Sequence, residues 1–137
     1  MSVSKVIQVS TGGQGLHEIT DEVCEFVHSE ELPNGICTVF LQHTSASLII
    51  QENADPSAKA DLEKWLCRLV KENDPHFTHT AEGPDDMPSH IKAALTTTSI
   101  TIPVIDSRLA LGTWQGIYIW EHRKSPHRRK IVVTLVG

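Results

Sequence analysis

Two carboxylates and a histidine stand close together in the segment Asp85-Asp86-Met87-Pro88-Ser89-His90-Ile91, which is too polar to belong to a hydrophobic core. If a helix begins near Pro88, both carboxylates lie at its positive end, where negative charge is favoured. His79 lies in the loop before this segment, and His43 lies far upstream beside two hydroxyl side chains. Histidines near carboxylates and hydroxyls are typical of metal or phosphate sites. The sequence therefore indicates such a site without specifying its reaction.

The candidate metal ligands are His43, His79 and His90. Neutral imidazole suits zinc, nickel, copper and iron, so a divalent transition metal such as zinc is the favoured cofactor. Magnesium is the alternative, although it prefers oxygen ligands. The chain contains no tight H-x-x-x-H pair, so local spacing does not show that the three side chains converge. The other interpretation is a hydrogen-bonded structural histidine at each position.

Hydroxyl and guanidinium groups could bind a phosphate near these histidines. Thr44 and Ser45 directly follow His43. Arginine has the planar fork that grips phosphate through two parallel hydrogen bonds, and Arg108, Arg123 and Arg129 are the candidates for this role. These side chains predict a phosphorylated small molecule as the ligand.

Three residues are candidates for catalysis. Glu121 ends a predicted strand beside a basic turn and could act as a general acid or base. Ser45 could be a nucleophile activated by a histidine, although residues two apart on a strand share a face without having to touch. His90 could transfer protons instead of binding metal. Gln115 lies on the opposite strand face from Trp114 and could point to the site or to a subunit contact.

Composition limits the class of protein. The chain has 137 residues, of which 39% are hydrophobic and 21% charged, as expected for one globular domain over residues 1–137. No apolar run approaches the roughly 20 residues of a membrane span, and no secretory signal is visible at the N-terminus. The three cysteines are widely spaced and odd in number, which favours a reducing compartment. We therefore expect a cytoplasmic protein without a membrane partner.

Charge is unevenly distributed. The net charge is −5, yet five of the twelve basic residues lie between His122 and Lys130. Binding of nucleic acid generally requires a broad basic face, so we expect no nucleic-acid partner. The basic segment is compatible with a local anion pocket or with a solvated turn.

Helices and strands are predicted without strict βαβ alternation. Alternating and β-branched segments predict strands at 3–10, 36–42, 47–51, 99–105, 111–121 and 130–136, and the last two are expected to pair as a hairpin. Helices are expected from Thr20 or Asp21 to about Glu31, from Pro56 to about Val70 with Asp55 as the N-cap, and from Pro88 to Leu95. The fold class is therefore α+β with a mixed or mostly antiparallel sheet. The long polar loop at 74–87 is expected to be functional because it carries His79.

Several of these stretches together resemble one family, the YjbQ-like proteins, over about residues 5–137. The matching stretches are Gln42-His43-Thr44-Ser45-Ala46-Ser47, Glu52-Asn53, Asp85-Asp86-Met87-Pro88-Ser89-His90-Ile91, Leu111-Gly112-Thr113-Trp114-Gln115-Gly116-Ile117 and Glu121-His122-Arg123. The resemblance implies a compact α+β homotrimer with a secondary thiamine-phosphate synthase activity. It also implies that the three histidines share one site and that Arg129 is the first choice for binding phosphate.

One position departs from the family pattern. Family members usually have glycine immediately before the Arg108-Leu109 pair, where this chain has Ser107. A glycine preference indicates a turn with positive φ, which serine adopts less readily. Ser107 is therefore expected to affect that turn and the nearby Arg108.

Two functions follow from these residues. The first is a small cytosolic enzyme acting on phosphorylated small molecules. Thiamine-phosphate synthesis, one such reaction, joins a pyrimidine diphosphate to a thiazole phosphate and releases pyrophosphate. Diphosphate chemistry generally uses magnesium, whereas the histidines favour a transition metal, so metal-assisted hydrolysis or transfer fits equally well. The alternative function is a non-catalytic trimer that binds a metal or an anionic metabolite.

Overall fold

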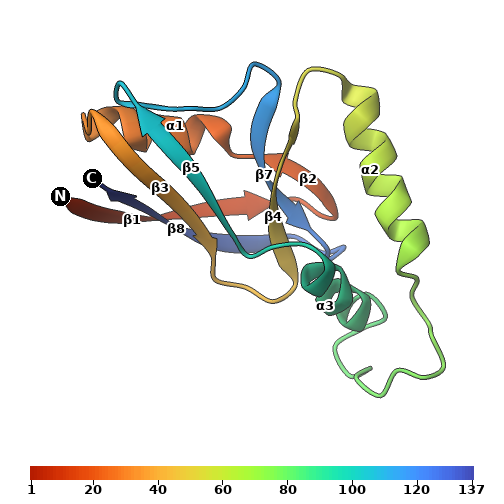
Figure 1. The fold of residues 1–137 in the computed structure, drawn as a ribbon. Coiled ribbons are helices and arrows are strands. Elements are labelled where there is room, and N and C mark those ends of the chain that lie inside the picture. The colour runs from red at the N-terminus through yellow and green to blue at the C-terminus, as the bar shows by residue number, and fades with distance from the viewer.

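Residues 1–137 are all described by the computed structural model, which contains three helices and two β-sheets (Figure 1). In chain order the elements are β1 (Ser2–Thr11), β2 (Gly15–Glu18), α1 (Thr20–Ser29), β3 (Asn34–Leu41), β4 (Ala46–Glu52), α2 (Pro56–Leu69), α3 (Asp86–Leu95), β5 (Ser99–Ile105), β6 (Arg108–Leu109), β7 (Gln115–Glu121) and β8 (His127–Val136). One sheet has the strand order β1-β8-β3-β5-β6 and the other has the order β2-β7-β4. Every strand pair is antiparallel, which confirms the predicted α+β class.

The main hydrophobic core lies between the two sheets and α1. Val23, Phe26 and Val27 recur at helical spacing and are buried, so α1 presents one apolar face inward. Strand alternation supplies the opposite wall, where Cys37, Val39 and Leu41 of β3 face inward and their neighbours in sequence face outward. This core is what fixes the five-stranded sheet against the three-stranded one.

Helix α2 covers the other face of the three-stranded sheet. Its N-terminus forms as predicted, because the Asp55 side chain accepts a hydrogen bond from the Ser57 amide at 2.9 Å. Leu66 packs with side chains of β2 and β7 in a second, smaller core. Trp65 and Leu69 are 50% and 55% exposed, so the buried stripe of α2 is narrower than its sequence predicts.

The predicted hairpin between the last two strands is wrong. Strand β7 pairs with β2 and β4, whereas β8 pairs with β1 and β3 in the other sheet. The physical reason is that β7 is buried on both faces: Ile117 and Ile119 belong to the main core, and Tyr118 and Trp120 pack against α2. The chain therefore crosses from one sheet to the other after β7. The strand also begins at Gln115, because the residues before it form a turn.

The turn between β5 and β6 has the backbone conformation that the glycine preference predicts. Ile105 pairs with Arg108, which leaves Asp106 and Ser107 as a two-residue loop. Their φ angles are 51° and 62°. Both values lie in the left-handed region, as in the tight turns whose twist matches antiparallel strands.

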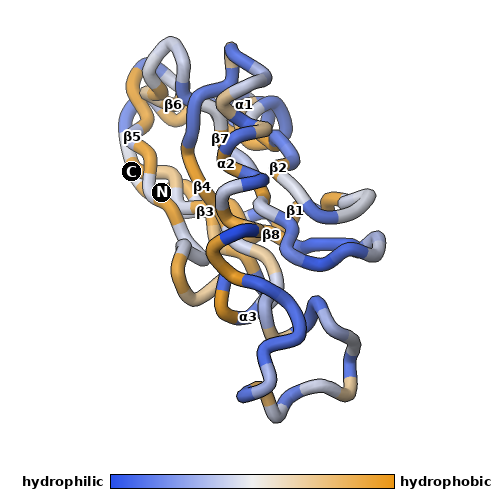
Figure 2. The backbone as a smooth tube through the Cα atoms, turned by 90° about the vertical axis from the view of Figure 1, so that its right-hand side faces the viewer, coloured by the Kyte–Doolittle hydropathy of each residue, from blue (hydrophilic) through white to orange (hydrophobic).

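The loop between α2 and α3 extends away from both sheets and is hydrophilic over most of its length (Figure 2). Helix α3 begins at Asp86, two residues earlier than predicted, so Asp86 and His90 lie one helical turn apart. None of the helices is both long and apolar enough to cross a membrane.

Candidate metal and anion site

The loop before α3 and the first turns of α3 bring four side chains with metal-binding atoms together. His79, Glu82, Asp86 and His90 each offer one such atom, and these atoms all lie within 4.8 Å of one another. Asp86 Oδ2 is at the centre, 2.6 Å from His79 Nε2 and 3.0 Å from His90 Nε2. Glu82 Oε2 lies 3.3 Å from His79 Nε2. We call these four residues the α3 cluster.

The hydrogen bonds of His90 determine which of its ring nitrogens carries the proton. His90 Nδ1 lies 2.9 Å from the backbone carbonyl oxygen of Thr44. A carbonyl oxygen can only accept a hydrogen bond, so Nδ1 is the donor. In neutral His90 the lone pair of Nε2 then faces the Asp86 carboxylate, and two acceptors meet at 3.0 Å. A second proton on the imidazole or a cation bound by both groups removes this repulsion.

Arg123 holds the carboxylates of the α3 cluster in place. Its Nη1 donates to Asp86 Oδ1 at 2.6 Å and its Nε donates to Asp85 Oδ2 at 3.0 Å. Its Nη2 donates to the backbone oxygen of Glu82 at 3.0 Å. Each of these three nitrogens has a protein acceptor, so Arg123 orients the cluster and does not form the phosphate clamp considered from the sequence.

The same contacts determine the protonation of Asp86 and His79. Burial would raise the pKa of Asp86, but hydrogen bonding to His79 and Glu82 and the charges of His90 and Arg123 lower it to about 2. The hydrogen bond to Asp86 raises the pKa of His79. The carboxylate is therefore ionised at neutral pH, and a metal ion entering the cluster competes with a proton on His79.

A second polar group, on the side of β7 that faces the five-stranded sheet, is fully buried. Glu121 has no exposed surface and accepts hydrogen bonds from Thr11 Oγ1 at 2.5 Å, from Arg129 Nε at 2.7 Å, from Arg129 Nη2, and from the Arg123 amide at 3.1 Å. Burial would raise the pKa of Glu121, but the bonds from Arg129 and Thr11 outweigh it and lower the pKa. The carboxylate is thus enclosed by protein donors, so the catalytic role predicted for Glu121 would require this network to open and stays a prediction.

Arg129 and Ser45 are bound to each other. Arg129 Nη2 donates to Ser45 Oγ at 2.9 Å, so the Ser45 hydroxyl accepts from Arg129 and keeps its own O–H to donate. Arg129 is 3% exposed. Its Nη1 atom has no hydrogen bond to the protein, and no buried side-chain nitrogen or oxygen lacks a partner, so Nη1 reaches solvent. The Nη1 nitrogen of Arg129, with its two N–H groups, remains for an anion, whereas Nε and Nη2 are held by Glu121 and Ser45.

His43 does not join the α3 cluster. Its Nε2 accepts a hydrogen bond from the Lys130 amide at 2.8 Å, which occupies the lone pair that would bind a metal. Burial and the charge of Arg129 lower the pKa of His43. Thr44 contributes its backbone oxygen to His90. The structure therefore brings two of the three predicted histidines together and gives the third a hydrogen bond to β8.

Gln115 and Arg108 lie far in space from the α3 cluster. Gln115 begins β7 and Glu121 ends it, so these residues are separated by about 20 Å of extended strand. The Gln115 side chain accepts a hydrogen bond from the Gly112 amide at 2.8 Å. Arg108 begins β6, directly after the turn at the opposite end of β5 from α3. Within one chain, neither residue can act with His79 and His90.

Three other residues were not identified as site residues from the sequence. Glu82 lies in the loop, where no periodic pattern indicates which side chains turn inward. His122 is 1% exposed and its Nε2 lies 2.9 Å from Ser47 Oγ. Lys92 is 4% exposed on α3. His122 could have been identified from its place directly after Glu121. Strand alternation predicts that the two side chains point to opposite faces of the sheet, so His122 belongs to a different polar group from Glu121.

Known proteins resemble this chain over nearly its whole length. The family model described as UPF0047 protein YjbQ-like matches residues 5–137. A UPF0047 protein from Synechocystis sp. is 47% identical over 133 residues, which are 97% of this chain and 90% of the relative. The UPF0047 protein YjbQ of Escherichia coli O157:H7 is 41% identical over 138 residues, covering 100% of this chain and 99% of the relative.

Solved structures agree with the sequence comparisons. The crystal structure of a YbjQ-like protein of unknown function from Sulfolobus solfataricus superposes with a TM-score of 0.90 at 25% identity, covering 100% of this chain and 98% of that one. A YjbQ/UPF0047 family protein from Clostridium acetobutylicum has a TM-score of 0.84 at 33% identity, covering 98% and 99%. This chain belongs to the UPF0047 YjbQ-like family.

Proposed function

We propose that this protein is a cytoplasmic, metal-dependent enzyme that acts on phosphorylated small molecules, with the metal held by the α3 cluster. The observation that carries the proposal is the approach of His90 Nε2 to the Asp86 carboxylate at 3.0 Å, within a set of four potential ligand atoms that all lie within 4.8 Å of one another. A metal cation bound by both groups would satisfy them together.

The donor set favours a transition metal. Two imidazole nitrogens and two carboxylates suit zinc, whereas magnesium prefers a shell of oxygen ligands and water. Zinc bound here would polarise a phosphoryl oxygen or activate a water molecule. The Thr44 carbonyl orients His90, and Arg123 orients Asp86, as partners outside a metal's own ligands commonly do.

An anionic substrate is supported by the cationic groups beside the α3 cluster. Arg129 Nη1 reaches solvent next to Ser45, and the charges of Arg129 and Lys130 both act on His43. We take the pyrimidine diphosphate and thiazole phosphate named by the family resemblance as the first substrates to test.

We also propose a homotrimer formed through the outer face of the five-stranded sheet. Val6, Ile36, Phe40, Ile105 and Val136 are each between 45% and 57% exposed, an unusually apolar set for a solvent-facing sheet. Association of copies would bury this face. Gln115 and Arg108 lie too far from the α3 cluster within one chain, so any part in its chemistry would need a neighbouring copy.

A non-catalytic metal-binding trimer is the second candidate function. The burial of Glu121 favours it, because the carboxylate predicted for proton transfer is enclosed by protein donors. A binding module needs only the α3 cluster and the nearby cations.

Zinc titration of chelator-treated protein tests the metal site. We expect one zinc per chain by calorimetry, loss of binding in His90→Ala, and unchanged binding in His76→Ala, the matched control from the same exposed loop. Arg123→Met removes the guanidinium that holds Asp85, Asp86 and the Glu82 backbone, and is expected to weaken binding about 10- to 100-fold. Zinc binding that survives His90→Ala would refute the assignment.

The pH dependence of zinc affinity provides a second criterion. Because Asp86 raises the pKa of His79 above its ordinary 6.5, zinc must displace a proton from His79 over a wider pH range. Affinity should therefore increase as pH rises through and above 6.5, and affinity that is flat from pH 5 to 8 would exclude histidine ligands.

Activity distinguishes the two functions. Pyrophosphate release from the substrate pair, or phosphate release from other phosphorylated metabolites, should require zinc and be lost in His90→Ala. Metal binding without any turnover across these substrates would instead support the binding module.

A further inference from the structure

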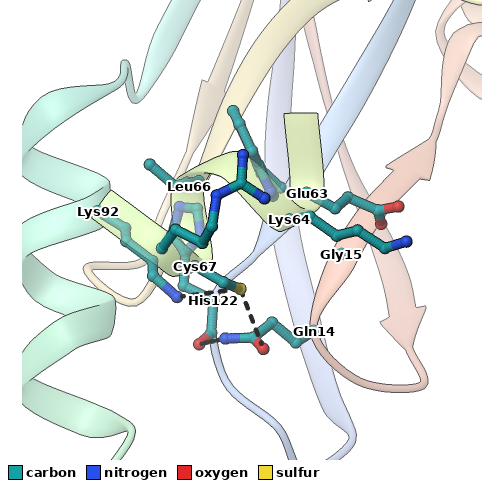
Figure 3. Close-up of a pocket in the computed structure, with 10 residues that line it drawn as sticks. Gln14, Gly15, Glu63, Lys64, Leu66, Cys67, Lys92 and His122 are labelled. Atoms are coloured by element: carbon teal, nitrogen blue, oxygen red, sulfur yellow. Dashed lines mark hydrogen bonds between the residues drawn. The ribbon is translucent and has the colours of Figure 1, made fainter. Parts of the chain in front are cut away.

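A cavity of about 470 Å³ lies between α2, α3 and the C-terminal end of β7 (Figure 3). No residue of the α3 cluster lines it. This volume falls within the range of pockets that hold small metabolites. The cavity is therefore separate from the proposed metal site, although both are adjacent to α3.

The end of the Lys92 side chain points into this cavity, toward Cys67 (Figure 3). Lys92 is 4% exposed, and its ammonium group has no carboxylate partner. The one acceptor within reach is Cys67 Sγ at 3.8 Å, a weak acceptor. A buried ammonium group with three donors and no counter-ion is unfavourable unless an anion or water completes its shell.

The other charged residues of the lining are mostly cationic. Lys64 and Arg68 line the cavity from α2. The single acidic residue, Glu63, is already bound to the Leu16 amide at 2.8 Å and to Lys59 at 3.5 Å. Glu63 makes no contact with Lys92.

Neutral polar groups complete the lining. His122 faces Lys92, and burial together with the Lys92 charge lowers the pKa of His122 to about 3, so it adds no second charge at neutral pH. The Gln14 amide nitrogen donates to the His122 carbonyl oxygen at 3.1 Å, which fixes Gln14 at the edge of the cavity. The lining thus has excess positive charge and no free carboxylate.

We propose that this cavity binds the phosphoryl group of a small phosphorylated molecule, with Lys92 as the direct ligand and Lys64 and Arg68 adding positive charge. A phosphoryl group has several acceptor oxygens and about two negative charges, which matches a buried ammonium supported by two further cations. The site does not require a metal, so it stands independently of the function proposed for the α3 cluster.

Inorganic phosphate is the first probe, titrated into the full-length protein by calorimetry at low ionic strength with a chelator present. We expect one saturable site. Lys92→Met, which keeps the length of the side chain and removes its charge, should weaken binding about tenfold or more. Lys5→Met, an equal change of charge on an exposed strand position, should leave binding unchanged.

Phosphate binding by His90→Ala shows whether phosphate occupies the cavity or the α3 cluster. If phosphate binds in the cavity, this variant retains it, even though the same variant is expected to lose zinc. Loss of phosphate binding in His90→Ala with retention in Lys92→Met would overturn the proposal, and so would the absence of saturable binding in the wild type.

Alkylation of Cys67 keeps the proposal testable if Lys92→Met does not fold. Cys67 is the exposed cysteine of the chain and lines the cavity, whereas Cys37 is buried and Cys24 lies elsewhere. Saturating phosphate should slow the reaction of iodoacetamide at Cys67 several-fold in the wild type, as measured by peptide mass spectrometry. An unchanged rate would show that the cavity does not hold the anion.

Discussion

The buried His122 makes the stability of this protein depend on pH in a way that one substitution can isolate. Its side chain is 1% exposed, its ring centroid lies 5.8 Å from that of Trp120, and its Nε2 lies 2.9 Å from Ser47 Oγ. Burial, reinforced by the charge of Lys92, lowers its pKa from 6.5 to about 3. His122 is therefore neutral in the folded protein over the range in which it becomes charged in the unfolded chain.

The sign and size of the effect follow from proton linkage. Between pH 6.5 and about pH 3 the unfolded state binds one more proton at this residue, so the free energy of unfolding falls as the solution is acidified. The stabilisation is fully present above the unfolded pKa and is lost as pH falls toward the folded pKa. Between pH 7 and pH 4 this one histidine should remove about 3 kcal/mol from the free energy of unfolding.

Urea unfolding of wild type and His122→Gln at both pH values measures this contribution. Glutamine places its amide near the position of Nε2 and cannot be protonated, so the variant should lose about 3 kcal/mol less than the wild type on acidification. Asp85, Asp86 and Glu121 also have lowered pKa values and contribute to acid destabilisation in both proteins, so their effect cancels in the comparison. Protein concentration must be held fixed if the chain associates.

His28→Gln, at an exposed position on α1, controls for the loss of a histidine as such. If wild type and His122→Gln lost equal stability between pH 7 and pH 4, His122 would have to be protonated in the folded state. The described burial of its ring would then be incorrect.

Three further substitutions test other parts of the structure. Ser107→Gly should raise the free energy of unfolding by about 0.5–1 kcal/mol in chemical denaturation, because the φ of 62° strains serine and not glycine. Glu121→Gln should lower it by about 3–5 kcal/mol by leaving the Arg129 charge buried alone, and adding Arg129→Met should recover much of the loss. Phe40→Glu should convert the proposed trimer to monomers in sedimentation velocity without unfolding the chain, whereas trimers that persist would place the interface elsewhere.

Local signals in the sequence predict the elements better than their arrangement. Asp55 followed by Pro56 marks the start of α2 because capping depends only on adjacent residues. The strands that pair with β7 could not be predicted. Alternation in the sequence shows which residues share a face of the strand, but it does not show that both faces of β7 are buried. The apolar run of Tyr118 to Trp120 therefore fits a hairpin with β8 and a place in a separate sheet equally well.

In the candidate site, too, local contacts could be predicted from the sequence and long-range contacts could not. Asp86 and His90 converge because four residues along a helix make one turn, which is a local property. His79 joins them through a loop whose path no periodicity describes. Lys92 could not be identified because a buried lysine without a carboxylate partner departs from the usual position of lysine at the surface.

The end of β7 connects the two proposed sites through strand geometry. Successive residues point to opposite faces, so Glu121 turns toward the five-stranded sheet and Arg129, while His122 turns toward the cavity that contains Lys92. Arg123, the next residue, reaches back to Asp86. Three consecutive side chains thus contact a buried ion pair, the anion cavity and the α3 cluster. The Glu121–Arg129 pair ties this segment to β8, and we therefore expect it to fix the relative position of the two proposed sites.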